Sequence, residues 1–261
     1  MLSVRAVTSV HPGSWFIHGP LRVAFLTTGL VLAAAFCAAE RAAANTITVN
    51  TTADTSAVDG SCSLREAITA ANTNAAVNEC SAGSSGSDTI EFNLGSGTPT
   101  ITLSSPLPTA TEPLVIDGNT GGATRVELNG NGVGGLDING GNSTVRALVI
   151  NRFPANGIDI ASNGGNTIEN CYIGTDATGT MDLGNAANGV RILSSNNTIG
   201  GTTAAARNVI SGNDVAGVLI QGGSNNVVEG NYIGTDVNGT ADLGQGSGKV
   251  TDRGFGSGKA W

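Results

Sequence analysis

The segment GIDI at residues 157–160 decides the fold, because it recurs along the chain. Its relatives are GLDI at 135–138, GVRI at 189–192 and GVLI at 217–220, at steps of 22, 32 and 28 residues. In each segment two aliphatic residues flank one variable position, which is the alternation of a strand that buries one face. This repeat predicts a stacked architecture, in which each unit buries its aliphatic face only against its neighbours.

A second series of short segments lies between the first. It comprises STVRALVI at 143–150, NTIENCYI at 166–173, NTIGG at 197–201 and NVVEGNYI at 226–233. These pieces have the length of strands and end in Asn and Gly turns. Helical repeats need longer periodic runs, and leucine-rich repeats need regularly spaced leucines. We therefore predict an all-β solenoid, a single-stranded parallel β-helix of about six rungs.

The aliphatic residues of successive rungs are expected to form columns inside this coil. Ile158 and Ile160 point to one side of their strand, and Asp159 points to the other. Asn and Gly at the corners tolerate left-handed backbone angles. An Asn side chain can also bond to its equivalent on the next rung, about 4.8 Å away.

Residues 1–44 are predicted to be a secretory signal peptide. Two arginines precede the apolar run at 23–39, and the small residues 42–44 follow it, so cleavage is expected before Asn45. A retained membrane anchor is the alternative, but the run is at the short end for a spanning helix. Cleavage predicts an exported chain with no membrane segment, and it removes both histidines.

The composition limits the partners of the exported chain. Aromatic residues make up 4% and charged residues 12% of the chain, whereas Gly occurs 39 times. The net charge of −8 becomes −10 without the leader, because 9 basic and 19 acidic residues remain. No basic stripe is left to neutralise phosphates, so nucleic-acid binding is not expected.

A short helix is predicted at 63–72, ahead of the repeats. Ser63 and Glu66 match the capping box, in which each side chain bonds to the backbone N–H of the other residue. Apolar residues follow at spacings of three and four, and Asn72 and Asn74 are expected to end the helix. Such a helix would cover the exposed edge of the first rung.

Two cysteines flank this helix and are predicted to form a disulfide. Cys62 and Cys80 enclose 17 residues, and a bridge of that span contributes about 3 kcal/mol in the chain-entropy model. A zinc site is the competing interpretation, but the ligand set lacks a histidine and a second cysteine pair. A third cysteine, Cys171, is expected to be a buried thiol.

The segment CSLREAITAAN at 62–72 resembles the signature of the CSLREA domain, and the six residues from Cys62 to Ala67 match it without a substitution. In that family the segment lies near the N-terminus of exported bacterial proteins, usually ahead of a right-handed parallel β-helix. The resemblance therefore implies export and right-handed β-helix (PbH1) repeats. It implies no catalytic activity.

Four segments follow from these patterns. Residues 1–44 form the leader, and residues 45–97 form a CSLREA-type cap with a strand, the helix and the disulfide. Residues 98–244 form the β-helix rungs. Residues 245–261 are Gly-rich and leave the repeat pattern, so we interpret them as the result of a truncation or a frameshift.

The most conspicuous repeat is a doubled loop, GTDATGTMDLGN at 174–185 and GTDVNGTADLGQ at 234–245. Asp can bond to its own backbone and Gly can adopt unusual angles, which predicts turns. Calcium binding is the alternative, since hard cations take oxygen ligands. The donors that would bind calcium are Asp176, Asp182, Asp236, Asn238 and Asp242.

Two acids occupy matching positions in successive repeats. Asp137 and Asp159 could raise each other's pKa, and glycoside hydrolysis needs two carboxylates about 5 to 9 Å apart. The next two repeats place Arg191 and Leu219 at this position. This series favours charge compensation, so no catalytic residue is assigned.

The leading functional prediction is a non-catalytic, adhesin-like module outside the cell or at its surface. Its expected partners are extracellular glycans or other cell-surface components, and no cofactor is assigned apart from the calcium alternative. Tyr172 and Tyr232 recur in register as candidate sugar contacts or as packing residues. The alternative is a polysaccharide lyase or glycoside hydrolase fragment whose active site is incomplete or lost.

Overall fold

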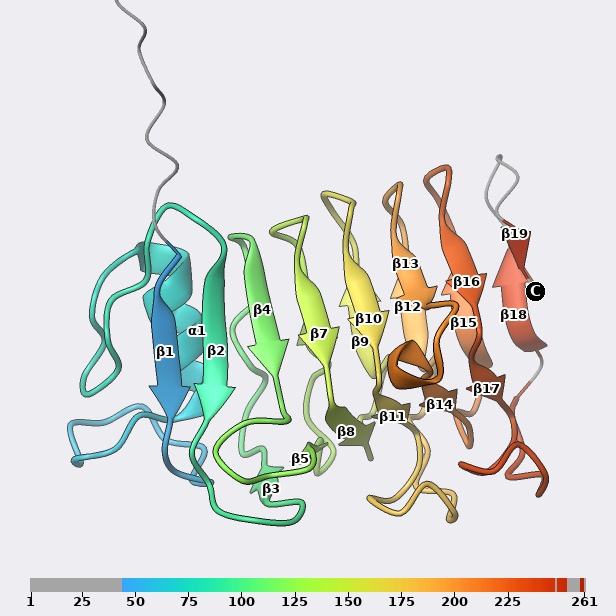
Figure 1. Cartoon of the computed structure of the whole chain (residues 1–261), viewed down its shortest axis with the longest axis horizontal. Coiled ribbons are helices and arrows are strands. Elements are labelled where there is room, and N and C mark those ends of the chain that lie inside the picture. The colour runs from blue at the N-terminus through green and yellow to red at the C-terminus, as the bar shows by residue number, and fades with distance from the viewer. Residues whose placement is uncertain (1–43, 247, 253–258, 261) are drawn as a thin grey trace, which may run out of the picture. The chain divides into compact units, whose positions relative to one another are not determined.

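The computed structural model describes residues 44–246, 248–252 and 259–260. Within them the chain forms nineteen strands, one α-helix and a short 3₁₀ helix at Ala204–Ala206. The strands form three sheets of eight, six and five members, and all their pairings are parallel (Figure 1). The prediction of an all-β, parallel fold with one helix is confirmed at this level. The predicted leader lies outside the described residues, apart from Ala44.

The eight-stranded sheet contains, in spatial order, β1 (Thr46–Val49), β2 (Asp88–Phe92), β4 (Leu114–Asp117), β7 (Thr144–Arg146), β10 (Thr167–Glu169), β13 (Thr198–Gly200), β16 (Val227–Glu229) and β19 (Lys259–Ala260). The six-stranded sheet contains β3 (Thr100–Thr102), β5 (Val126–Asn129), β8 (Leu148–Asn151), β11 (Tyr172–Ile173), β14 (Val209–Ile210) and β17 (Tyr232–Ile233). The five-stranded sheet contains β6 (Leu136–Asp137), β9 (Ile158–Ile160), β12 (Val190–Ile192), β15 (Ala216–Ile220) and β18 (Gly248–Asp252).

From β6 onward the chain visits the three sheets in a fixed rotation. β6, β7 and β8 belong to the five-, eight- and six-stranded sheets, and the same order returns with β9–β11, β12–β14 and β15–β17. Each circuit therefore adds one parallel strand to every sheet. In Figure 1 the strands of the eight-stranded sheet follow one another in chain order from β1 to β19.

The aliphatic residues of the repeated segments align across the five-stranded sheet as predicted. Val190 of β12 pairs with Ile158 of β9 and with Val218 of β15. All three side chains are fully buried. Burial of such side chains contributes about 1.5–3 kcal/mol each, and neighbouring strands supply the surface that buries them.

Buried asparagines bond from one strand connection to the next. Nδ2 of Asn166 donates to Oδ1 of Asn197 at 2.9 Å, and Nδ2 of Asn197 donates to Oδ1 of Asn226 at 2.9 Å. The backbone N–H of each donor residue bonds to the same oxygen. These bonds satisfy polar groups that the stacked connections remove from water.

Helix α1 (Leu64–Thr73) begins and ends as its sequence requires. Ser63 accepts a bond from the Glu66 N–H, and the Glu66 side chain accepts one from the Ser63 N–H, which completes the capping box. Asn74 ends the helix in the left-handed conformation, with φ of 53°. The apolar face of α1 is buried, and the helix packs against β1 and β2, at the end of the eight-stranded sheet opposite β19 (Figure 1).

The observed sheets extend beyond the expected repeat region at both ends. β1 and β2 already belong to the same sheet as β4, so no sheet boundary falls at residue 97. After Gly244, β18 continues the five-stranded sheet with Val250 opposite Val218. Of the residues expected to leave the pattern, Gly248–Asp252 form β18 and Lys259–Ala260 form β19, whereas 247, 253–258 and 261 lie outside the described part of the chain.

Candidate functional site

Two aspartates hold the repeated loops by accepting hydrogen bonds from the loop backbone. Oδ1 of Asp176 accepts the N–H groups of Thr180 and Met181, both at 2.9 Å. Oδ1 of Asp236 accepts the equivalent two groups of the second loop at 2.8 and 3.1 Å. Burial raises the pKa of Asp176, but the hydrogen bonds outweigh it and leave the pKa below its ordinary value. The carboxylates therefore act as internal anchors.

The remaining oxygen donors of the loops follow the same pattern. Asp182 and Asp242 each accept the N–H two residues further on, at 2.9 Å. Asn238 donates to Asp236 at 3.1 Å. In the part of the chain that the structure describes, no three acidic, His or Cys side chains form a group that could hold a metal. The hydrogen bonds of Asp182 and Asp242 to the N–H two residues further on are those of Asx turns.

The recurring tyrosines are packed by an arginine and a loop glycine. The guanidinium carbon of Arg125 lies 3.8 Å from the centre of the Tyr172 ring. Gly179 has φ of +70°, and a Cβ there would lie 3.1 Å from the same ring. Tyr232 repeats the arrangement with Arg207, whose guanidinium carbon lies 4.3 Å from the ring centre. Cation–π contact and close packing explain why Tyr and Gly return together.

The outward-facing acids of the five-stranded sheet are compensated by an arginine. Asp137 is paired in register with Asp159, and Asp159 with Arg191. Nε of Arg191 lies 3.1 Å from Oδ1 of Asp159, and the two side chains form an ion pair. Burial and then the charge of Asp159 raise the pKa of Asp137, while Arg191 opposes the rise. The predicted charge compensation is present, and Asp137 remains as one acid with a raised pKa.

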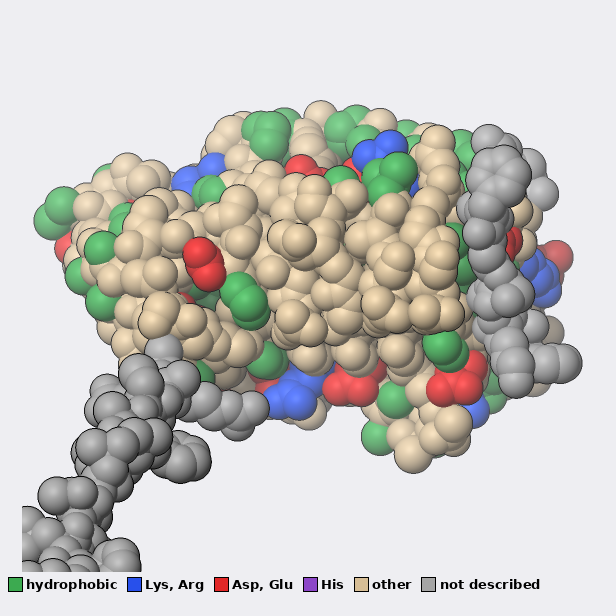
Figure 2. Space-filling model, turned by 90° about the horizontal axis from the view of Figure 1, so that it is seen from above, with side chains coloured by type: hydrophobic (Ala, Val, Ile, Leu, Met, Phe, Trp, Pro, Cys, Tyr) green, Lys and Arg blue, Asp and Glu red, His purple; other side chains and the backbone are tan. Residues whose placement is uncertain are grey.

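The surface around these sheets carries few charges. Figure 2 shows a face made mostly of uncharged polar side chains and backbone, with acidic and basic groups close together near its margins. Besides Arg191–Asp159, three ion pairs among the described residues neutralise charged side chains. They are Arg65–Asp54, Arg146–Asp117 and Arg152–Glu127.

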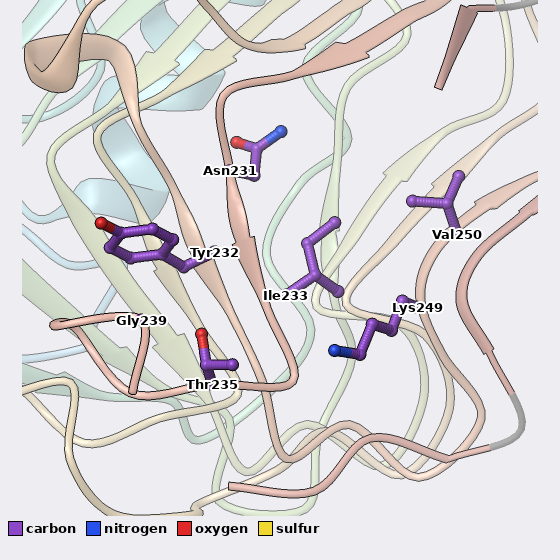
Figure 3. Close-up of a pocket in the computed structure, with 7 residues that line it drawn as sticks. All are labelled: Asn231, Tyr232, Ile233, Thr235, Gly239, Lys249 and Val250. Carbon is purple, nitrogen blue, oxygen red and sulfur yellow. The ribbon is translucent and has the colours of Figure 1, made fainter. Parts of the chain in front are cut away.

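A pocket of about 340 Å³ lies beside the second loop (Figure 3). It forms next to β17, the edge strand of the six-stranded sheet, where Ile233 is only partly buried, although its counterparts on β11 and β14 are fully buried. The lining residues are Asn231, Tyr232, Ile233, Thr235, Gly239, Lys249 and Val250. Inner strands of this sheet have a strand on each side, whereas β17 has a described strand on one side only. The pocket lies beside this edge strand.

The pocket is lined by hydroxyl, ammonium, aromatic and apolar groups. Oγ1 of Thr235 is buried and has no hydrogen-bond partner within the described structure. Lys249 is exposed and supplies an ammonium donor. Tyr232 supplies an aromatic surface, and Ile233 and Val250 supply an apolar wall. A small site of this kind binds by apolar contact and a few placed polar groups.

The cap contains the predicted disulfide and a charged cluster that the sequence analysis did not foresee. Cys62 and Cys80 are joined. Arg65 donates to both oxygens of Asp54 at 2.9 Å and to the carbonyls of Ser105 and Pro106 at 2.9 and 2.8 Å. Arg65 therefore ties the segment before the helix to the segment after β3.

The third cysteine lies inside the described fold. Cys171 is free and fully buried. Burial raises the pKa of its thiol to about 12, so the reactive thiolate form is suppressed at neutral pH. This agrees with its expected packing role.

The chain was compared with protein-family models, curated proteins and solved structures, and none of the three comparisons found a match.

Proposed function

We propose that the chain is an exported, non-catalytic module that serves a structural or adhesive role outside the cell or at its surface. The observation that carries the proposal is the internal use of charge. Apart from Asp137, the candidate acids form ion pairs or accept hydrogen bonds from their own loop backbone, as Asp159 and Asp176 illustrate. Acids that are bonded within the protein suit a structural module. Acid–base catalysis instead needs two carboxyl groups that are free to act on a substrate.

The proposed architecture is a right-handed single-stranded parallel β-helix. Its support is the rotation of the chain through three parallel sheets and the residue columns that cross them. A right hand is expected because parallel crossovers are right-handed in about 98% of cases. The similarity of residues 62–67 to the CSLREA signature points to the same architecture and to bacterial export. Among the described residues no helix is long and apolar enough to span a membrane.

The proposed contact with glycans is assigned to the pocket beside the second loop. Its hydroxyl, ammonium and aromatic groups can bond to and pack against sugar rings. The excess of acidic residues in the chain favours neutral glycans over anionic ones. Adhesion by one such pocket would be weak and would gain from several copies on a surface.

A glycan array tests this assignment. The exported chain should bind neutral oligosaccharides, and Lys249→Gln should weaken binding about tenfold, the effect of losing about 1.4 kcal/mol. Lys249→Arg, which keeps a charged donor, is the matched control and should retain most of the binding. If neither variant changed the affinity, the pocket would not be the glycan site. If the chain bound no glycan, only the structural role would remain.

One observation favours the enzymatic alternative, namely the raised pKa of Asp137. A general acid in glycoside hydrolysis is a carboxyl group with a raised pKa, which donates a proton to the glycosidic oxygen. A screen of mixed polysaccharides for new reducing or unsaturated ends tests this directly. We expect no release of sugar ends; release that Asp137→Asn abolishes would establish the hydrolase or lyase interpretation instead.

A further inference from the structure

The buried carboxylate of Asp88 lies against Asn45, the residue that precedes β1. Asp88 begins β2 and is 1% exposed. Its Oδ1 accepts the backbone N–H of Asn45 at 3.0 Å and the hydroxyl of Ser84 at 2.6 Å, and Oδ2 accepts the Ser84 N–H at 2.9 Å. In the uncleaved chain the nitrogen of Asn45 belongs to a peptide bond, so all three donors are uncharged.

No described cation balances this carboxylate. The four ion pairs found among the described residues use other acids. A buried carboxylate that has only neutral partners carries a large desolvation cost. Asp88 therefore lacks the partner that a buried acid ordinarily has.

The recess around Asp88 is closely fitted. A Cβ added to Gly83 would lie 2.5 Å from Oδ2 of Asp88 and 2.7 Å from the carbonyl oxygen of Ala70. The glycine backbone thus closes over the carboxylate from one side. The backbone N–H of Asn45 also donates to this carboxylate.

Asn45 is held by its side-chain NH2 group and by its backbone carbonyl. Its side-chain amide donates to the carbonyls of Ala82 and Gly83 at 3.1 and 3.3 Å. Its carbonyl accepts the N–H of Thr89 at 2.8 Å. The backbone nitrogen is therefore held in place by contacts that do not depend on the residues before it. The small residues 42–44 that precede Asn45 form the expected cleavage pattern.

We propose that a signal peptidase cleaves the Ala44–Asn45 bond and that the released α-ammonium group of Asn45 forms an ion pair with Asp88. The inference rests on the proposed export of the chain. Water adds across the peptide bond, so its hydroxyl goes to the carbonyl carbon of Ala44 and a proton goes to the nitrogen of Asn45. The amine then takes a second proton from solvent and becomes an ammonium, as α-amino groups with a pKa of about 8 do at neutral pH.

The proposed step needs no movement of the strand. The nitrogen already lies 3.0 Å from Oδ1 of Asp88, and cleavage converts a neutral hydrogen bond into a charge-assisted one, which is roughly twice as strong. Removal of the leader would therefore stabilise the pairing of β1 with β2. Cleavage before Asn45 would thus increase the stability of the folded chain.

Four proteins test the proposal, all expressed from the full chain with its own leader in an exporting bacterium. They are the natural chain, Asp88→Asn, a chain with Gly-Ser inserted between Ala44 and Asn45, and the combination of both changes. The insertion leaves the Asn45 nitrogen as an amide after cleavage. Intact mass should place the natural N-terminus at Asn45. Asp88→Asn should lower the melting midpoint by several degrees more in the natural chain than in the inserted chain.

A second measurement covers the case in which Asp88→Asn does not fold. The α-amine of the natural chain should react with an acylating reagent about tenfold more slowly than that of the inserted chain. A neighbouring carboxylate favours the ammonium form and so lowers the fraction of free amine, which is the form that reacts. Equal acylation rates, or equal effects of Asp88→Asn in both chains, would overturn the ion pair and leave export intact. Cleavage at another bond would also overturn the inference alone, whereas no cleavage would overturn export as well.

Discussion

At the scale of single residues, the cap is stabilised by side chains that join distant segments. Arg65 bonds to Asp54 and to two carbonyls about forty residues further along the chain. Asp54 also accepts the N–H of Ser104 at 2.7 Å. Burial raises the pKa of Asp54, but these bonds and the Arg65 charge leave it below its ordinary value. One arginine thus fixes the entry to α1 against the first connection of the six-stranded sheet.

Replacing Arg65 should destabilise the fold strongly. Arg65→Met leaves the Asp54 carboxylate, whose side chain is 3% exposed, without its cation, and breaking such a pair from one side costs about 3 kcal/mol or more. Urea denaturation measures the loss. Asp54→Asn in the same chain should restore part of the stability, since no uncompensated charge remains. Equal losses in the single and double variants would contradict a direct partnership.

The loop aspartates predict a loss of stability in acid. The folded pKa of Asp176 is lowered, so its contribution is fully present above the unfolded pKa of about 4 and is lost as the pH falls through the lower folded pKa. Asp176→Asn should therefore flatten the fall in unfolding free energy below pH of about 4. Asp214→Asn, at an exposed aspartate, serves as the control and should leave that fall unchanged.

At the scale of elements, connections between strands are held by the ladder of Asn166, Asn197 and Asn226. Each step uses one amide and one backbone N–H on the same acceptor. Successive asparagines of the ladder are 31 and 29 residues apart. The same hydrogen bonds therefore form although the intervening loops differ in length. It aligns the eight-stranded sheet while the surface loops vary.

Removing the central amide should break this alignment locally. Asn197→Ala leaves the backbone N–H of Asn166 without its acceptor and removes one of the two donors to Oδ1 of Asn226. An unsatisfied buried group costs about 1–3 kcal/mol. Thermal and urea unfolding measure the loss. Asn119→Ala, at an exposed asparagine, should stay within about 0.5 kcal/mol. A similar small effect at both positions would mean that the ladder does not stabilise the connections.

The loop glycines allow backbone strain and close contact to be separated. Gly179 and Gly132 have φ of +70° and +78°, but only Gly179 has neighbours within reach of an added Cβ, namely Val237 and the Tyr172 ring. Both Ala variants carry the left-handed strain of about 1–2 kcal/mol. Gly179→Ala should cost about 1 kcal/mol more in urea denaturation, because its neighbours must also move. Equal losses would show that the ring does not support the loop.

The elements that the sequence predicts are those carried by a local pattern. The pairing of Ile158, Val190 and Val218 follows from the spacing of aliphatic residues, and the helix follows from its capping box. β18 could not be predicted because a single residue, Val250, continues its column. The partners of Arg65 lie 11 and about forty residues away. The pocket depends on which strand ends the six-stranded sheet, and no local pattern encodes that.

At the scale of the whole described chain, the three parallel sheets depend on one another. Each circuit from β6 onward contributes one strand to every sheet, so the strands of one circuit bury their aliphatic side chains against those of the neighbouring circuits. The α-helix covers the sheets at the β1 end, whereas β17 leaves one edge with a pocket. This difference between the two ends places the proposed glycan contact away from the cap and the proposed processing site.

The most direct test of the account is a crystal structure of the exported chain. The account predicts a right-handed coil in which Ile158, Val190 and Val218 lie on adjacent parallel strands, about 4.8 Å apart, with their side chains buried in one column. A structure in which these residues belong to different sheets, or in which their strands run antiparallel, would contradict the stacked architecture and every proposal that depends on it.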